Sequence, residues 1–338
     1  MRYFLTGATG FLGGRLLKRL LDDGHVVHAL VRDRAKAGAI QEDAVKRAGR
    51  LELVEGDITD KESMRIAMDG ADGVYHCAAW YKVGRAATRT ASKAREINVE
   101  GTRNVLELMD ELSVPKGVYV STLAVNSDTG GEMVDESYRF SGEHLNTYNR
   151  TKWEAHYKVA EPMMKAGLPL VVVMPGLIYG PGDTSIVRPM IKKYLKRKLF
   201  ALPKAPEYCW AHVDDIAMAC ELAMQKGTVG EDYIISGERY GFAAAFDLMA
   251  EISGVPAPRR RFSPGTLRFF AGFMQAFAWL NPPDDFHPEV LRLSAEATYL
   301  GDNSKAKAEL GYEPRSLRVG LEETLAVEMA ELRMVKNK

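Results

Sequence analysis

The feature that most constrains this chain is its first thirteen residues, in which an apolar strand runs directly into three spaced glycines. The strand is predicted at Tyr3–Leu5, and Gly7, Gly10 and Gly13 follow it. Such a turn lets a pyrophosphate approach the backbone and lets the next helix pack closely against the strand. Free N–H groups and the macrodipole at the helix N-terminus favour negative charge. The start of the chain therefore predicts a cradle for the phosphates of a nucleotide.

The residues after the glycines complete one β-α-β unit. Leucines at helical spacing follow Gly13, the segment Asp22-Asp23-Gly24 would end that helix, and a second strand is expected over Val26–Val31. The unit spans about 30 residues, which is the usual size of this motif. A glycine triplet alone arises often by chance, so it is this context that favours a nucleotide-binding turn.

Strand-like and helical segments alternate through the first half of the chain. This pattern predicts a doubly wound parallel sheet with helices on both faces, whose ligands bind beyond the carboxyl ends of the strands. After Pro175 proline and glycine become frequent and the helices become shorter and more aromatic. We predict a nucleotide-binding domain over 1–175, rejoined by 207–236, and a smaller, mostly helical substrate-binding lobe built from 176–206 and 237–338. The expected strands are Tyr3–Leu5, Val26–Val31, Leu51–Val54, Val74–Cys77, Val118–Ser121, Leu170–Met174 and Asp232–Ser236, with helices near 11–23, 34–48, 61–69, 93–112 and 147–166.

Composition limits the partners of this chain. The formal net charge is zero and no basic block dominates, which argues against a nucleic-acid or anionic-membrane partner. The three cysteines lie far apart, so we expect reduced thiols in a cytoplasmic protein. Met1 leads directly into the first predicted strand, and we therefore expect no signal peptide. The apolar stretch 266–280 is interrupted by Arg268 and Gln275 and is too short to span a bilayer. We interpret it as a helix packed over a substrate pocket rather than an interfacial membrane helix.

Tyr148 and Lys152 form the second informative group. They stand four residues apart in a predicted helix, so their side chains share one face. A lysine ammonium near a phenol favours the phenolate and lowers the pKa of the tyrosine. Such a tyrosine can exchange a proton with a substrate oxygen while a hydride moves at carbon. The same spacing also describes a surface tyrosine beside a helix lysine, and the preceding segment Val118–Thr122 favours the functional interpretation.

Six ordered motifs together resemble the extended short-chain dehydrogenases/reductases, which have a Rossmann-type fold. The resemblance covers essentially the whole chain, and the late segment 302–312 is similar to the dihydroflavonol-4-reductase-like branch of the NAD-dependent epimerase/dehydratase family. The motifs are Gly7-x-x-Gly10-x-x-Gly13, Ile97 to Thr102, Ser121-Thr122, Tyr148-x-x-x-Lys152, Pro175 to Gly182 and His212 to Asp215.

The resemblance implies a role for each matching residue. Tyr148 would be the acid/base, and Lys152 would be its electrostatic partner and bind the nicotinamide ribose. Thr122 would hydrogen-bond the reacting oxygen, with Ser121 as the competing candidate, and Asp57 is either the adenine-contacting aspartate or an ordinary loop cap. No metal is expected, and a homodimer through the helices at 93–112 and 147–166 is implied. The remaining cofactor contacts would come from Gly7, Thr9, Gly10, Phe11, Leu12, Ile58, Cys77, Ala78, Ala79, Pro175, Leu177 and Ile178.

The choice between NADP and NAD can be argued from charge at the end of the second strand. NAD binding usually requires an acidic residue there, to accept a hydrogen bond from a ribose hydroxyl. Here Arg32 stands where a guanidinium could bind a 2′-phosphate bidentately, which favours NADP. Asp33 could serve NAD if the register differed by one residue.

The histidines carry weaker signals. His25 and His28 would point to opposite faces of their strand and make a poor metal pair. His76 and His144 fall near the predicted site, where either could touch substrate. We interpret both as structural, hydrogen-bonded histidines.

Three functions fit these motifs. An NADP-dependent reductase of a small carbonyl compound would use Tyr148 and Thr122 directly, a nucleotide-sugar epimerase would use the same residues with tightly retained NAD, and a non-catalytic nucleotide sensor would need neither. The presence of Leu123 and Ala124 after the threonine argues against a 4,6-dehydratase, which needs carboxylic groups there. The aromatic residues of the second lobe favour an apolar carbonyl substrate and therefore the reductase. They are Phe262, Phe269, Phe270, Phe273, Phe277 and Trp279.

Overall fold

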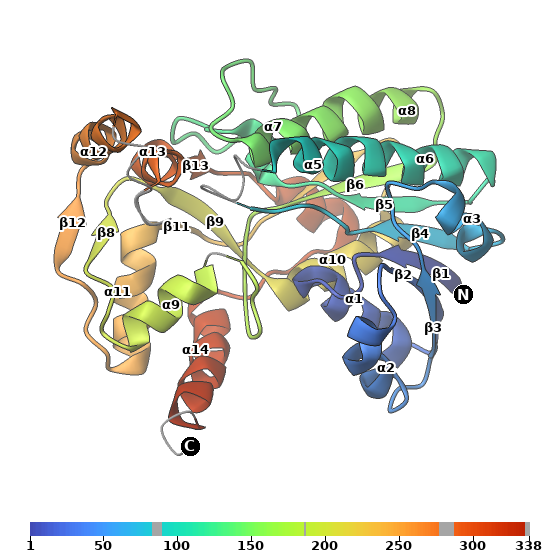
Figure 1. The fold of residues 1–338 in the computed structure, drawn as a ribbon, viewed down its shortest axis with the longest axis horizontal. Coiled ribbons are helices and arrows are strands. Elements are labelled where there is room, and N and C mark those ends of the chain that lie inside the picture. The colour runs from blue at the N-terminus through green and yellow to red at the C-terminus, as the bar shows by residue number, and fades with distance from the viewer. Residues whose placement is uncertain (83–89, 186, 277–286, 335–338) are drawn as a thin grey trace.

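Among the residues that the structure describes, seven parallel strands form the central sheet (Figure 1). The structure is a computed structural model and describes residues 1–82, 90–185, 187–276 and 287–334. The strand order is β3-β2-β1-β4-β5-β6-β10, so the chain reverses its direction of winding between β1 and β4. This order confirms the predicted doubly wound, Rossmann-type sheet. The strands are β1 (Arg2–Thr6), β2 (Val26–Val31), β3 (Arg50–Glu55), β4 (Gly73–His76), β5 (Gly117–Val120), β6 (Leu170–Pro175) and β10 (Asp232–Ile235).

Helices cover both faces of this sheet (Figure 1). In β1, Phe4 and Leu5 point to opposite faces and neither is exposed, because each packs into a separate apolar cluster. One layer contains α5 (Ala91–Arg95), α6 (Gly101–Glu111), α7 (Thr147–Trp153) and α8 (Glu161–Lys165), and the other contains α1 (Phe11–Asp22), α2 (Gly38–Ala44) and α10 (Val213–Lys226). The short α3 (Glu62–Met68) packs beside the first of these layers.

Two of the predicted long helices are continuous but contain one wider turn each. A π-helical turn over Glu96–Glu100 joins α5 to α6, and another over Glu154–Ala160 joins α7 to α8. The helix expected near 34–48 is shorter, since α2 ends at Ala44 and is preceded only by a 3₁₀ turn at Ala35–Ala37. The other expected elements lie within a few residues of their predicted bounds.

Smaller sheets and helices from the second half of the chain lie beside the central sheet, on the left of Figure 1. They surround a third apolar cluster that includes Trp210 and Phe246. The strands are β7 (Leu177–Tyr179), β8 (Ala201–Pro203), β9 (Glu207–His212), β11 (Arg239–Gly241), β12 (Arg260–Phe262) and β13 (Thr298–Tyr299). The helices are α9 (Val187–Leu195), α11 (Phe242–Ser253), α12 (Pro264–Ala276), α13 (Pro288–Glu296) and α14 (Leu317–Met334).

The apolar stretch predicted to pack over a substrate pocket forms α12, and its aromatic side chains face outward. Phe269 is 70% exposed, and Phe270 and Phe273 are also exposed, because the helix packs on α13 through Leu267 and Ala271 instead. These three phenylalanines therefore do not supply the expected apolar pocket. Two others named in the prediction, Phe277 and Trp279, lie outside the described residues. Within the described residues, we find no helix whose length and apolarity would let it cross a bilayer.

Candidate active site

The glycine turn between β1 and α1 has the geometry of a phosphate cradle. Gly7 adopts a left-handed conformation with φ +80°, and its carbonyl accepts a 2.8 Å hydrogen bond from the Gly10 N–H. Gly10 precedes α1 without any side-chain cap, and the first turn of the helix contains no acidic residue. The free N–H groups of this turn can therefore receive an anion.

Close packing requires glycine at positions 7 and 13. A Cβ atom on Gly13 would lie 2.1 Å from the Gly7 carbonyl oxygen, and one on Gly7 would lie 2.8 Å from the Ala78 nitrogen. The second contact brings the turn against the backbone of Cys77 and Ala78, which follow β4. The turn thus fits a dinucleotide, since a side chain at either position would fill the cradle.

We expect Gly13→Ala to abolish binding of the dinucleotide and to lower the free energy of unfolding. The added methyl group meets backbone atoms of Gly7, which can yield only by moving α1 away from β1, at a cost of about 1–3 kcal/mol. Gly14→Ala is the matched control, because its Cβ would lie 3.4 Å from the nearest atom, which is an ordinary contact. Urea unfolding and NADPH fluorescence titration of both variants check this. Equal behaviour of the two would contradict it.

Arg32 and Asp33 differ in their contacts. Asp33 accepts hydrogen bonds from the backbone N–H groups of Ala35 and Lys36 and lies 3.0 Å from the Lys36 ammonium. The hydrogen bond from Lys36 lowers the pKa of the Asp33 carboxyl. Arg32 is exposed, and no hydrogen bond or ion pair joins its guanidinium to other described residues. The acid is therefore engaged in a local turn, while the guanidinium is available to a ligand.

The loop after β3 is held in place by its own hydrogen bonds. Asp57 accepts from both the backbone N–H and the hydroxyl of Thr59, each at 3.0 Å. Ile58 is buried and lies under Gly101, where a Cβ would come within 2.7 Å of it. Asp57 thus acts as a loop cap in this structure, and the bonds leave its second carboxylate oxygen for a ligand.

The two histidines near the site are both hydrogen-bonded. His76 is buried, with Nδ1 2.8 Å from the Thr6 hydroxyl and Nε2 3.0 Å from the Thr102 hydroxyl. Thr102 donates to a backbone carbonyl and the Thr6 oxygen accepts the Ala78 N–H, so the ring carries its proton on Nε2. Burial lowers the pKa of His76 to about 3. The ring of His144 packs beside other aromatics, and its Nδ1 lies 2.7 Å from the Ser127 hydroxyl.

Tyr148 and Thr122 meet where β5 ends and α7 begins. The Thr122 hydroxyl lies close enough to the Tyr148 phenol to favour the phenolate, but burial is the larger effect and raises the pKa of Tyr148 to about 12. Thr122 also accepts the Ala124 N–H at 3.1 Å. Ser121, the competing candidate, is directed away and lies 2.9 Å from a ring nitrogen of His156. The geometry favours Thr122 as the hydroxyl beside the phenol.

Lys152 lies one helical turn from Tyr148, and its ammonium is directed elsewhere. Its Nζ donates to the Tyr119 hydroxyl and to the Val120 carbonyl, both at 2.9 Å. The side chain is almost completely buried, and this burial lowers the pKa of Lys152 to about 7. The expectation that this lysine lowers the pKa of the tyrosine is therefore wrong for the protein alone, because desolvation of the phenol dominates.

Several tyrosines near Tyr148 were not predicted from the sequence to belong to the site. The ring of Tyr81 meets that of Tyr148 edge-on at 4.7 Å, and Asn149 donates to the Tyr299 hydroxyl at 3.2 Å. Tyr208 packs against Tyr299 with 5.5 Å between ring centroids. These residues come from three distant segments, so no local pattern announces them. They give the surroundings of Tyr148 an aromatic character.

The segment predicted to line the nicotinamide follows directly from the central sheet. Pro175 ends β6, and Leu177 and Ile178 lie in β7, which pairs with β9. Gly176, between β6 and β7, allows the backbone to pass close to β9, since a Cβ there would lie 2.2 Å from the Cys209 carbonyl oxygen. The predicted residues thus stand at the carboxyl end of β6, the edge at which ligands bind in doubly wound sheets.

Comparison with known proteins agrees with this geometry. The model of the NAD-dependent epimerase/dehydratase family matches residues 3–236. A Synechocystis sp. protein provisionally named as a dihydroflavonol 4-reductase is 29% identical over 338 residues, covering 94% of this chain and 92% of its own. The 4-hydroxy-2-methyl-3-oxo-4-farnesyl-3,4-dihydroquinoline-1-oxide ketoreductase of Stigmatella aurantiaca is 29% identical over 328 residues. The match covers 93% of this chain and 92% of the ketoreductase.

Solved structures have the same fold. The NAD-bound dTDP-glucose 4,6-dehydratase of Streptomyces venezuelae, as a double mutant, superimposes with a TM-score of 0.77 at 24% identity, covering 99% of this chain and 98% of that one. At this identity the likeness establishes the fold alone.

Proposed function

The chain belongs to the NAD-dependent epimerase/dehydratase family of extended short-chain dehydrogenases/reductases, and we propose that it is an NADP-dependent oxidoreductase that reduces a ketone or aldehyde. The observation that carries the proposal is the proximity of the Thr122 hydroxyl and the Tyr148 phenol at the edge of the sheet where the glycine turn also lies. The cradle of Gly7 and Gly13 fits the phosphates of NADP, and Arg32, whose guanidinium has no partner among the described residues, fits the 2′-phosphate.

The proposed mechanism assigns one task to each side chain. NADPH supplies the hydride for the carbonyl carbon. Thr122 donates a hydrogen bond to the carbonyl oxygen, and Tyr148 gives that oxygen its phenolic proton, so an alcohol leaves. Because burial keeps the pKa of Tyr148 near 12, the proton is present at neutral pH. Lys152, whose ammonium bonds Tyr119 and Val120 in the protein alone, would bind the nicotinamide ribose.

We expect Arg32→Ala to weaken NADPH binding and to leave NADH binding unchanged. Loss of charge-assisted hydrogen bonds to a 2′-phosphate corresponds to a rise in Kd of about ten- to a hundredfold. Lys46→Ala removes an exposed positive charge from the same domain and is the control. Fluorescence titration with both nucleotides measures the effect. An equal change for NADPH and NADH would assign Arg32 to general electrostatics instead.

The proposed substrate is small and predominantly apolar. Tyr81, Tyr208 and Tyr299 near the proton donor support this, since aromatic walls with a few polar groups suit such ligands. The ketoreductase relative acts, by its name, on a farnesylated quinoline oxide, which is in keeping with this choice. We propose that 176–206 and 237–338 supply the substrate contacts, as a lobe beside the nucleotide-binding domain.

Assembly and location are also proposals. A homodimer through the layer of α5 to α8 would follow the family resemblance, and light scattering after size exclusion measures it: a monomeric mass at all concentrations excludes it. The free thiols of Cys77, Cys209 and Cys220 support a reducing, cytoplasmic environment.

The test of the proposed function begins with the purified protein as it emerges from cells. Its absorbance reports any retained nucleotide, and separate titrations with NADPH and NADH follow. Empty protein that prefers NADPH, and that oxidises it with a member of an aldehyde and ketone panel, supports the reductase. Tightly retained NAD that resists dialysis, with turnover of nucleotide sugars, would replace it with an epimerase.

A further inference from the structure

Two buried side chains and a partly buried carboxylate, none of them part of the proposed proton-transfer group of Thr122 and Tyr148, form a chain of hydrogen bonds. The Ser121 hydroxyl lies 2.9 Å from Nδ1 of His156, and Nε2 of the same ring lies 3.1 Å from a carboxylate oxygen of Asp232. His156 has no exposed surface and Ser121 is 4% exposed. With both nitrogens bonded, the ring is held in one orientation between β5 and the edge strand β10.

These hydrogen bonds adjoin those of Lys152, on the helix that begins as α7 and carries Tyr148. His156 follows Lys152 by one turn and lies in a π-helical turn, a distortion that is frequent at functional sites. Lys152 bonds the carbonyl of Val120, and His156 bonds the next residue, Ser121. The residue after that is Thr122. Two consecutive positions of the strand end, immediately before the proposed substrate-binding hydroxyl, are therefore tied to one face of the helix that carries the phenol.

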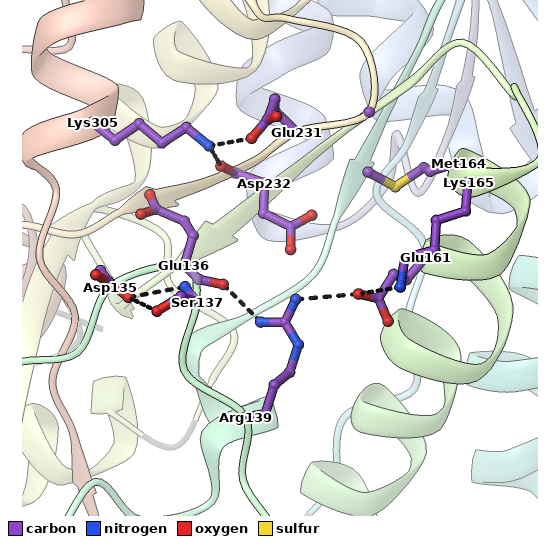
Figure 2. A pocket seen from close by; sticks show the side chains of 11 residues that line it. Asp135, Glu136, Ser137, Arg139, Glu161, Met164, Lys165, Glu231, Asp232 and Lys305 are labelled. Carbon is purple, nitrogen blue, oxygen red and sulfur yellow. Dashed lines mark hydrogen bonds and ion pairs between the residues drawn. The ribbon is translucent and has the colours of Figure 1, made fainter.

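The outer end of the chain lies in the wall of a pocket of 460 Å³ (Figure 2). Asp232 is surrounded there by Glu136, Arg139, Glu161 and Lys305. Burial is the largest single effect on Asp232 and opposes its ionisation, but the hydrogen bond from the imidazole and the charges of His156, Arg139 and Lys305 together outweigh it, and the pKa lies below its usual range. Arg139 and Lys305 form ion pairs with Glu161 and Glu231, while the Asp232 carboxylate has its hydrogen bond with the imidazole.

We propose that His156 and Asp232 are positioning residues for the proton-transfer group. Asp232 accepts the Nε2–H of the imidazole, which leaves Nδ1 to accept the hydroxyl proton of Ser121 in the neutral ring. This bond holds the end of β5 against the helix, so that the Thr122 hydroxyl stays aimed at the phenol. The inference rests on the proposed function, because it concerns the geometry of the same reacting oxygen.

The set of serine, histidine and aspartate is not a nucleophilic triad. In such triads the carboxylate binds Nδ1 and the serine binds Nε2, whereas here the two contacts are exchanged. The serine is also buried, and it does not line the pocket of Figure 2. Its hydroxyl therefore serves as a structural hydrogen-bond partner.

Two amide substitutions separate the halves of this chain. In His156→Gln the terminal amide replaces Nε2, so the bond to Asp232 is kept and the bond to Ser121 is lost. In His156→Asn the shorter amide replaces Nδ1, so the bond to Ser121 is kept. Kinetics use the ketone or aldehyde of the panel that is turned over, and Glu161→Gln is the control from the same pocket wall.

We expect the glutamine variant to lower kcat by about ten- to a hundredfold, the scale of a small misplacement of reacting groups, while the Kd for NADPH is unchanged. The asparagine variant should recover most of the loss, and Ser121→Ala should repeat the behaviour of glutamine. Equal loss of kcat and of thermal stability in both amide variants would overturn the proposal, since simple packing would then explain the histidine.

A second measurement needs no turnover. The imidazole ¹⁵N spectrum of the wild-type protein, assigned with His156→Gln, should show one neutral form with the proton on Nε2, and Asp232→Asn should remove this preference. A proton on Nδ1, or on both nitrogens at neutral pH, would overturn the inference whatever the reaction. Absence of turnover with every carbonyl compound, with the Nε2–H form present, would instead overturn the proposed function.

Discussion

Replacement of Tyr148 by phenylalanine is expected to lower kcat by about 10²- to 10⁴-fold, the contribution of a positioned proton donor. The phenylalanine keeps the aromatic ring against Tyr81 and removes only the hydroxyl that Thr122 contacts. Hydride transfer would then leave a buried alkoxide without a proton. Because the change occurs at the reacting oxygen, the affinity for NADPH should stay close to that of the wild type. Stopped-flow oxidation of bound NADPH isolates the chemical step.

Tyr157→Phe is the matched control for this result. Tyr157 lies on the continuation of the same helix, and its ring packs against His156 and Arg139 without a hydrogen bond from its hydroxyl within the described residues. It should keep wild-type kcat. Retention of activity in Tyr148→Phe would mean that another group protonates the substrate, and the mechanism proposed for Thr122 and Tyr148 would have to be abandoned.

The backbone of the site was predictable from the sequence, because it depends on local rules. Gly7 and Gly13 occupy positions where a turn and a close helix–strand contact leave no room for a side chain, and a Cβ on Gly10 would lie only 3.1 Å from the Gly7 carbonyl oxygen. The alternation of apolar strands and amphipathic helices likewise determines the doubly wound sheet. Such features involve residues that are near one another in the chain, and their bounds came within a few residues of those observed.

What the sequence left open depends on contacts between distant segments. The sequence favours Thr122 over Ser121 only by resemblance, and the contact that distinguishes the two residues in the structure is the one between Ser121 and His156, 35 positions away. The outward direction of Phe269 on α12 follows from which face packs on α13, and helical spacing does not reveal this. The pKa of Tyr148 is raised by burial, and the ammonium of Lys152 bonds Tyr119 and Val120 instead of acting on the phenol as the spacing implied.

Replacement of Lys152 gives the second large expected effect, because this buried lysine is proposed to serve the reaction while its charge lowers stability. Lys152→Met should raise the free energy of unfolding near pH 7 by about 1–3 kcal/mol, because a buried ammonium is costly and methionine has a similar length without the charge. The gain is less than the full cost of the charge, since the bonds to Tyr119 and Val120 are lost with it. Activity should fall by about 10²-fold or more, because the side chain proposed to bind the nicotinamide ribose is lost.

The pH dependence of this gain has a definite sign. The pKa of Lys152 is about 7 in the folded protein, against 10.5 for an ordinary lysine such as that of the unfolded chain. Between these two pH values the unfolded chain therefore binds more protons at this residue than the folded protein does. The contribution of Lys152 to stability therefore rises with pH across that window, and the advantage of Lys152→Met should shrink as pH rises from about 7 towards 10. Urea unfolding of both proteins at several pH values measures it, with the exposed Lys158→Met as the control. A constant difference across the window would show that the ammonium is satisfied by its two partners, and that the enzyme maintains its charged lysine at no cost to its stability.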